Sequence, residues 1–357
     1  MASEKRTVTK YCDNSFNIWR ILFTIMIMVF HLSDGSTFYD EYPQFSYHWY
    51  IAVEFFFVLS GYLLMSHAEK HPEESSFEYI KGRVCRLYPE YIAAFLAMVV
   101  LKTVRKGLNP IKFIVPNWLE ALMLQSIGTN KFPYLNNPAW YVSALLIGSY
   151  IIYYLLKNYR RLYLELLGPV GGLAVFAYLY RTYRDLQGFT DTKGFFLNQA
   201  VLRSLLGLTI GIYVYLIAEW FRKNWECRVP ALFSLVETGI FVGVPVVALF
   251  IDDKDYDFIF LILFAIGIFC ASQDRILGKL AGSRPLSWLA EISYSTYMIH
   301  FVIMLLINKY WDTTMWHWWH IPVYIAVTIV AGAIMHYCVA VIVKLIKKIG
   351  VFRKKND

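Results

Sequence analysis

The sequence predicts an all-α integral membrane protein: a bundle of about ten transmembrane helices plus one interfacial or re-entrant helix, with both termini in the cytoplasm. Of the 357 residues, 58% are hydrophobic and only 17% are charged, whereas soluble globular chains carry about 25% charged residues. Ten segments are apolar over roughly the length that a helix needs to cross a bilayer. Lysine and arginine gather in alternate loops, a pattern that orients membrane helices.

The ten apolar segments fill most of the chain. In order they lie at about 16–33, 47–66, 88–104, 140–157, 164–180, 200–221, 231–250, 258–272, 286–308 and 322–346. The polar gaps between them are only as long as loops, so no soluble domain is expected among them. We expect a cytoplasmic tail over 1–15, a transmembrane domain over 16–346 and a basic cytoplasmic tail over 347–357.

The positions of the basic residues predict how the helices are oriented. Lys5, Arg6 and Lys10 place the N-terminus in the cytoplasm. Every second loop is then basic, through Lys70, Lys81, Arg83 and Arg86; Lys157, Arg160 and Arg161; Arg222, Lys223 and Arg228; and Arg275, Lys279 and Arg284. An even number of spans returns the tail KLIKKIGVFRKK to the same side, and the acidic loops DGSTFYDEYPQF and DDKDYD fall outside.

One loop departs from this pattern, because it places four basic residues outside: Lys102, Arg105, Lys106 and Lys112. The apolar stretch that follows, 113–127, is too short to span the bilayer and contains Trp118 and Glu120. We interpret it as an interfacial or re-entrant helix. If it crossed the membrane, every later loop would be inverted, so ten spans is the better interpretation.

Charge and cysteine content exclude several other classes of protein. The net charge of +8 is spread over short loops and the tail, so no basic face for nucleic acid is expected. The five cysteines have no paired spacing, which argues against both disulfides and a cysteine metal site. His317 and His320 are three residues apart, but the aromatic residues around them favour a membrane-interface belt over a metal site.

The first apolar segment carries two ionisable residues, Arg20 and His31. Eleven helical residues turn through about 1100°, so both side chains lie on one face, about 16 Å apart along the axis. Ionisable groups within a membrane helix usually face a cavity or a partner. The pair therefore marks a polar lane inside the bundle, or else Arg20 snorkels to the headgroups and His31 caps the outer end. The segment alone does not decide between these two interpretations.

The second apolar segment contains Glu54, and a buried carboxylate must be paired, protonated or hydrated. Its nearest partners in chain order are Arg20, which would make a structural ion pair, and His31, which Glu54 would orient for catalysis. Arg83 and Arg86, three residues apart, share a helix face at the cytoplasmic boundary. Two such arginines suit a phosphate group, although spacing alone favours ordinary basic residues that contact anionic lipid.

Five motifs occur together and in order. They are the Arg20 and His31 pair, AVEFFFVLSGYLL, the R-x-x-R of Arg83 and Arg86 followed by LYP, NPAWYVSALL, and ISYSTYMIH. Together they resemble the membrane-bound acyltransferase family 3, whose members O-acylate sugars of surface polysaccharides, peptidoglycan and Nod factors. The resemblance covers nearly the whole chain, from about residue 16 to beyond residue 301.

The resemblance implies roles for the matching residues. It implies catalytic roles for Arg20 and His31, with His31 as a general base or a transient acyl carrier, and an acyl-CoA-binding role for Arg83 and Arg86. Glu54 stands where the family commonly has Asp, which leaves the partner of this catalytic candidate open. The substrate-binding candidates are Trp140, Tyr141 and Ser143 of a W-Y-(I/L)-S-A-like motif, Arg203, which resembles an arginine often found in that span, and His300.

For several of these candidates a structural role is also open. Arg203 is a charge within a membrane span that pairs with Glu54 or meets substrate. His300 and Tyr297 share a helix face, where hydrogen bonding between helices is the simpler role. Trp140 lines an acceptor entrance, where it would stack on a sugar, or anchors at the interface. His336 has no companion motif and is expected to serve packing.

The expected function is transfer of an acyl group, by default acetyl, from cytoplasmic acyl-CoA to a sugar hydroxyl. The acceptor would be a surface polysaccharide, a glycolipid or a lipid-linked glycan. No bound cofactor or metal is expected, and acetyl-CoA or another acyl-CoA is the donor substrate. The expected partners are the glycan, the bilayer of a bacterial inner membrane and proteins of polysaccharide assembly. The alternative is a transporter or flippase of a lipid-linked glycan, which intramembrane charges also suit.

Overall fold

The computed structural model describes residues 2–34, 47–127, 134–191, 198–225, 230–251, 253–273, 276–310 and 318–353, and every regular element in these residues is helical. Ten helical segments are long and apolar enough to cross a membrane. They are Asn14–Ser33, His48–Lys70, Ser76–Lys106, Asn137–Asn158, Arg160–Thr182, Gln199–Asn224, Pro230–Val247, Lys254–Gln273, Arg284–Asn308 and His320–Ile349. The predicted all-α bundle of about ten spans is therefore confirmed.

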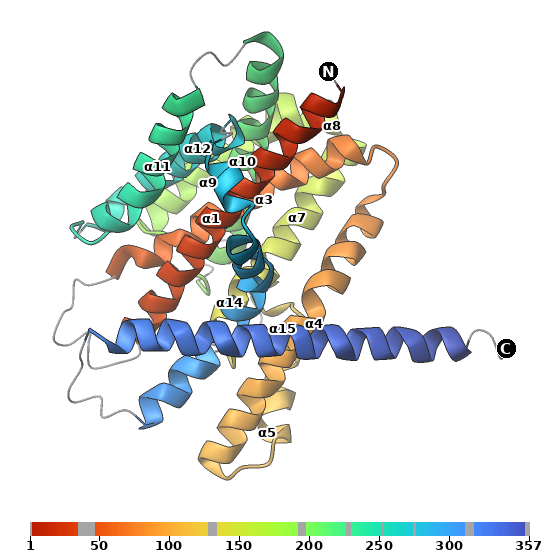
Figure 1. Ribbon diagram of the computed structural model, residues 1–357, viewed down its shortest axis with the longest axis vertical. Helices are drawn as coiled ribbons and strands as arrows, with labels where there is room; N and C mark the ends of the chain where they lie inside the picture. The colour runs from red at the N-terminus through yellow and green to blue at the C-terminus, as the bar shows by residue number, and fades with distance from the viewer. Residues whose placement is uncertain are drawn as a thin grey trace.

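The long helices are shown in Figure 1. They are α1 (Ala2–Asp34), α3 (Ala52–Lys70), α4 (Ser76–Lys106), α7 (Trp140–Asn158), α9 (Gly168–Thr182), α10 (Gln199–Asn224), α11 (Pro230–Val247), α12 (Asp257–Gln273), α14 (Arg284–Tyr310) and α15 (His320–Arg353). The short ones are η1 (Tyr47–Ile51), α5 (Ile111–Ile114), η2 (Val115–Asn117), α6 (Trp118–Ala121), η3 (Gln125–Ile127), η4 (Asn137–Ala139), α8 (Arg160–Leu162), the π-helical η5 (Tyr163–Leu167), η6 (Lys254–Tyr256) and α13 (Ile276–Ala281). Two long helices extend into the expected tails, since α1 begins at Ala2 and α15 ends at Arg353.

The helix α4 has clear start and stop signals in its sequence. Ser75 and Glu78 form a capping box, in which the Ser75 hydroxyl accepts from the Glu78 N–H and the Glu78 carboxylate accepts from the Ser75 N–H. Gly107 ends the helix in the left-handed region, with φ of 62°, which glycine adopts without steric cost. The helix between these caps is long enough to run past the bundle toward α5 (Figure 1).

The closest helix packing joins α3 to α10. A Cβ built on Gly61 would lie 2.1 Å from the Leu208 carbonyl oxygen, and one built on Gly211 would lie 1.9 Å from that of Val58. Only residues without a side chain allow two backbones to approach so closely, as is common between membrane helices. We call this contact the glycine seam; it lies at the centre of the bundle, where α3 and α10 are largely buried.

The stretch 111–127 does not cross the membrane as a single helix. It consists of the short elements α5, η2, α6 and η3, so the expected single interfacial or re-entrant helix is divided into four short helical pieces. One cause is visible after α6, where Met123 adopts a positive φ of 61°, a conformation that L-residues with side chains rarely adopt and that interrupts a right-handed helix.

Glu120 fixes this broken stretch to the start of α7. Its two carboxylate oxygens accept hydrogen bonds from the backbone N–H groups of Leu135 and Asn136, each at 2.7 Å. The side chain is fully buried, and burial raises the pKa of this carboxyl from 4.5 to about 7. The Asn136 side chain in turn donates to the Met298 carbonyl at 3.1 Å, so one carboxylate organises the contact with α14 as well.

The last long helix, α15, crosses the front of the bundle in Figure 1 at a steep angle to α1 and reaches past the other helices at its C-terminal end. It packs chiefly against α14, with further contacts to α4 and α1. Most of its surface is exposed in the protein alone. This helix closes one side of the cavity described next.

Candidate active site

A cavity of about 420 Å³ lies among α1, α3, α4, α7, α14 and α15. Three arginines line it: Arg20 from α1, and Arg83 and Arg86 from α4. The structure thus brings Arg20 together with the pair of Arg83 and Arg86, which lies far from it in the sequence and was predicted separately. Because these guanidinium groups stay charged and present planar donors, the cavity is suited to phosphate or carboxylate groups.

The two arginines of α4 differ in their environment. Arg83 donates from Nη1 to the Tyr79 hydroxyl at 2.6 Å, and the Tyr79 ring is stacked on that of Tyr153 at 3.8 Å between centroids. Arg86 is exposed and, among the described residues, has no ion-pair partner. Arg83 is therefore held in place by neighbours, whereas Arg86 remains available to a ligand.

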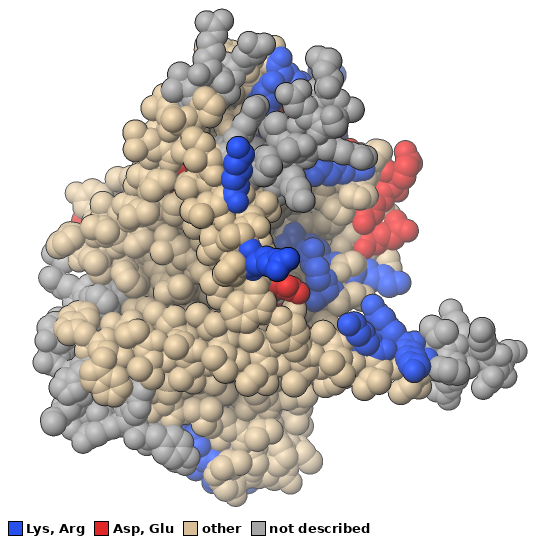
Figure 2. All heavy atoms as spheres, in the orientation of Figure 1, with Lys and Arg blue, Asp and Glu red and all other residues tan. Residues whose placement is uncertain are grey.

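A second cavity of about 420 Å³ shares Arg20 and Leu63 with the first and extends to the end of α3, where Lys70 and His67 line it. This end of α3 belongs to the side predicted to be cytoplasmic. On the face drawn in Figure 2, lysine and arginine atoms gather toward the side where α4 and the C-terminal end of α15 lie, with a group of acidic side chains at the edge of the same side, and the opposite side is nearly free of charge. An anionic ligand would meet positive charge at this entrance.

His31 is not among the residues that line the cavity, but it continues the same face of α1. Arg20, Thr24 and Ile27 line the wall, and His31 lies one turn further along that face. Its ring lies 5.2 Å from that of His300 between centroids. On α14, Tyr297 lines the cavity and precedes His300 by three residues, so both walls lead toward the two histidines.

The two histidines sit in an apolar surrounding. His31 is 9% exposed and contacts the rings of Phe30 and Phe301. His300 is fully buried, and its Nδ1 hydrogen-bonds the Tyr297 carbonyl. Because a carbonyl only accepts, Nδ1 carries the proton, which leaves Nε2 of the neutral ring as an acceptor. That Nε2 has no hydrogen-bond partner among the described residues, so it can accept a hydrogen bond from a group beside it.

Glu54 forms an ion pair with Arg203 and not with Arg20 or His31. Arg203 contacts Oε1 of Glu54 through Nε at 2.7 Å and Nη2 at 2.6 Å, and both side chains are 1% exposed. Arg203 also donates from Nη1 to the Gly188 carbonyl at 2.8 Å. Of the alternatives that the sequence left open, the structure contains the pair of Glu54 with Arg203. This pair joins α3 to α10 and is not among the residues that line the cavity.

The three candidates at the start of α7 have different environments. Tyr141 lines the cavity. Trp140 is stacked on Phe189 at 5.1 Å between centroids and lies under the Arg203 guanidinium at 4.9 Å, so this ring already has aromatic and cationic neighbours. Ser143 is fully buried and accepts a hydrogen bond from the Ser126 N–H at 3.1 Å, which is a structural contact.

Sequence reasoning missed three residues of the cavity: Glu90, Glu291 and His336. Nδ1 of His336 lies 2.7 Å from Oε1 of Glu90, and Nε2 lies 3.4 Å from Oε1 of Glu291. His336 was expected to serve packing; it also contacts these two carboxylates and lines the cavity. The signal was absent because the three residues belong to three spans that are far apart in the sequence.

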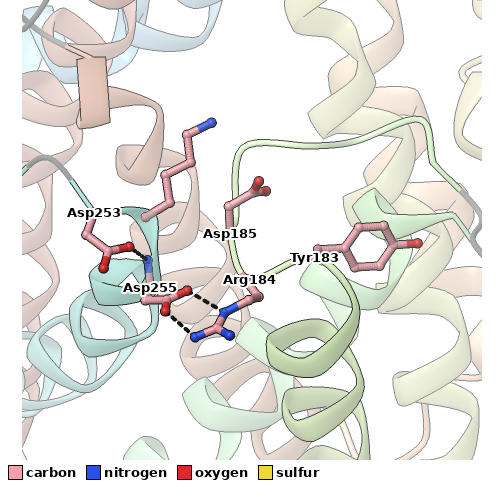
Figure 3. A pocket seen from close by; sticks show the side chains of 6 residues that line it. Tyr183, Arg184, Asp185, Asp253 and Asp255 are labelled. Carbon is pink, nitrogen blue, oxygen red and sulfur yellow. Dashed lines mark hydrogen bonds and ion pairs between the residues drawn. The ribbon is translucent and has the colours of Figure 1, made fainter.

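Another pocket, of about 510 Å³, lies at the opposite end of the bundle between the segments that follow α9 and α11. Figure 3 shows Arg184 held by both carboxylate oxygens of Asp255, with Asp185 and Asp253 nearby. These charges largely satisfy one another, and the nucleophiles and bases predicted from the sequence are not among its lining residues. We therefore place the candidate active site in the arginine-lined cavity.

Among the residues that the structure describes, no group of three histidine, cysteine, aspartate or glutamate side chains is arranged to hold a metal ion. His317 lies outside the described residues, so its spacing from His320 is not represented.

A family model described as an acyltransferase domain matches residues 13–337, which is most of the chain. No curated protein and no solved structure matches it.

Proposed function

This chain belongs to the membrane acyltransferase family 3, and on that premise we propose that it transfers an acetyl group from acetyl-CoA to a sugar hydroxyl. The protein is a multi-pass membrane acyltransferase. The donor, the acetyl group, the glycan acceptor and a bacterial inner membrane are parts of the proposal. The observation that carries it is the cavity in which Arg20, Arg83 and Arg86 converge.

The arginines suit the phosphate groups of coenzyme A. Arg83 and Arg86 lie three residues apart on α4, so both can reach one anionic group from the same face. Arg20 lies on the opposite helix, α1, and borders both cavities. In this proposal the phosphates enter from the cytoplasmic side and bind here.

The distance along α1 separates the roles of Arg20 and His31. Their eleven-residue spacing is about 16 Å along the helix, so one small reacting group cannot touch both side chains. We assign Arg20 to the polar part of the donor and His31 to the reacting end. The pantetheine arm of the donor would cover the intervening length, past Thr24 and Ile27.

The reaction then needs one base and one leaving group. His31 takes the proton from the acceptor hydroxyl while the oxygen of that hydroxyl attacks the carbonyl carbon of the thioester. A carbon–oxygen bond forms, the carbon–sulfur bond breaks, and the thiolate of coenzyme A leaves and takes up the proton. The unpaired Nε2 of His300 supports this role, since a neighbouring acceptor can orient the N–H of His31.

The proposal is tested with purified protein in detergent or nanodiscs. We expect coenzyme A to raise the melting temperature of the wild type and not that of Arg83→Ala/Arg86→Ala. Incubation with labelled acetyl-CoA and candidate glycans, followed by mass spectrometry, identifies the acetylated product. A wild-type protein that neither binds coenzyme A nor transfers label to any glycan would overturn the proposal.

A further inference from the structure

Three helices meet at the imidazole of His336 on the wall of the arginine-lined cavity. His336 comes from α15, Glu90 from α4 and Glu291 from α14, with ion-pair distances of 2.7 Å and 3.4 Å. The Glu90 side chain is 13% exposed, whereas that of Glu291 is 59% exposed. Because solvent screens exposed pairs, the contact with Glu90 is the stronger of the two.

Glu90 presents a difficulty for an anion-binding cavity. It follows Arg86 by four residues, so the two side chains are neighbours on one face of α4. A carboxylate at this position would pair with the Arg86 guanidinium and repel phosphate. Yet among the described residues Arg86 has no ion-pair partner, and Glu90 is paired with His336.

The chemistry of the imidazole explains this arrangement. Nδ1 of His336 hydrogen-bonds Oε1 of Glu90 at 2.7 Å, and because a carboxylate oxygen only accepts, this nitrogen carries the proton. The hydrogen bond holds Glu90 on the α15 side of the cavity, and Nε2 of the same ring lies 3.4 Å from Oε1 of Glu291. Arg86 is then left with its donors unoccupied, beside Arg83 and Arg20.

We propose that His336 is a positioning residue of the donor site, which keeps Glu90 from pairing with Arg86 and so leaves that arginine available for the phosphates of the donor. Glu291 serves as a second, weaker anchor for the same ring. The inference rests on the proposed function, since it assumes that the cavity binds coenzyme A. It gives α15 a part in donor binding, although none of the five sequence motifs contains a residue of this helix.

The test compares His336→Ala, Glu90→Gln and the double variant His336→Ala/Glu90→Gln. The dissociation constant for coenzyme A is measured by titration calorimetry, and KM and kcat for acetyl-CoA are measured alongside. We expect His336→Ala to weaken binding by about ten-fold, because the charge-assisted phosphate contact of Arg86 is lost, and to raise KM more than it lowers kcat. In the double variant, where the carboxylate is gone, binding returns to within about three-fold of wild type.

Ile334→Ala serves as the control on the same helix, because Ile334 is exposed and does not line the cavity. If His336 only held the helices together, the double variant would bind no better than His336→Ala, and that result would overturn the inference. Unchanged binding by His336→Ala would overturn it too. If His336→Ala does not fold, His336→Gln takes its place in both the single and the double variant.

The two proposals fail in different ways. Wild-type protein that does not bind coenzyme A contradicts the proposed function and this inference together. Normal binding by the wild type, with its loss in Arg83→Ala/Arg86→Ala but no rescue through Glu90, contradicts this inference alone.

Discussion

The Arg203 guanidinium holds one oxygen of the Glu54 carboxylate between its Nε and Nη2 atoms, at 2.7 Å and 2.6 Å. The two side chains come from α10 and α3, and neither is accessible to solvent. The same guanidinium reaches the Gly188 carbonyl through Nη1 and covers the Trp140 ring. One buried cation thus joins two helices, the segment before α10 and the start of α7.

Removing either member of this pair should destabilise the protein strongly. Arg203→Ala leaves a buried carboxylate without a partner, and such losses cost about 3–5 kcal/mol. The double variant Glu54→Leu/Arg203→Met removes both charges, so we expect it to be more stable than either single variant. Thermal melting in detergent measures all three.

The exposed pair of Arg184 and Asp255 provides the matched control, since its side chains are 62% and 29% exposed. Arg184→Ala should change stability by no more than about 1 kcal/mol. A double variant of Glu54 and Arg203 whose loss equals the sum of its single losses would contradict the pairing.

The glycine seam gives a second prediction. Gly61→Ala puts a methyl group 2.1 Å from a backbone oxygen of α10, which cannot move aside as a flexible side chain would. We expect overpacking to cost at least about 1–3 kcal/mol. Gly239→Ala in α11, where no atom lies within 4 Å of the added carbon, should be harmless; equal melting temperatures for the two variants would refute the close approach.

Binding and chemistry should be separable, because the proposed base lies on α1 and the proposed phosphate-binding arginines lie on α4. His31→Ala removes the proposed base, which typically costs about 10²–10⁴-fold in rate, while the thermal shift caused by coenzyme A should remain. Arg83→Ala/Arg86→Ala should abolish that shift. The rates come from single-turnover transfer of labelled acetyl; near-normal transfer by folded His31→Ala would end the assignment of His31.

Glu120 predicts a pH dependence of stability. Burial raises the pKa of its carboxyl from 4.5 to about 7, so between these values the folded state binds a proton that the unfolded state releases. Stability therefore falls as pH rises through this range, by at most about 1.4 kcal/mol per pH unit from this group, and levels off above pH 7.

Melting curves at a series of pH values, compared between the wild type and Glu120→Gln, isolate this contribution. The difference in stability between the two proteins should change between pH 4.5 and 7 and stay constant above it. A constant difference across the whole range would show that Glu120 is not the titrating group.

Much of the fold was predictable, because membrane spans are encoded locally. Length and hydropathy alone identify all ten, and the helical period places Arg20 and His31 on one face. The break at Met123 was not predictable, since nothing in the local sequence indicates a positive φ at this methionine.

The candidate site was predictable only in part. The motifs indicated Arg20, Arg83 and Arg86, and the structure brings them into one cavity. The sequence left the partner of Glu54 open among Arg20, His31 and Arg203, and it gave no sign that Glu90 pairs with His336. Such partners depend on which helices pack together, which a single sequence does not specify.

The spacing of Arg20 and His31 on one rigid helix has a consequence for substrate choice. The helix fixes the separation of these two residues along its axis at about 16 Å. With the proposed roles of Arg20 and His31, a donor would be selected by the length between its anionic head and its activated carbonyl, more than by the size of either. In acetyl phosphate the phosphate and the acetyl carbonyl are adjacent, so the molecule would reach Arg20 or His31 but not both at once. It should therefore be a poor donor despite its reactivity.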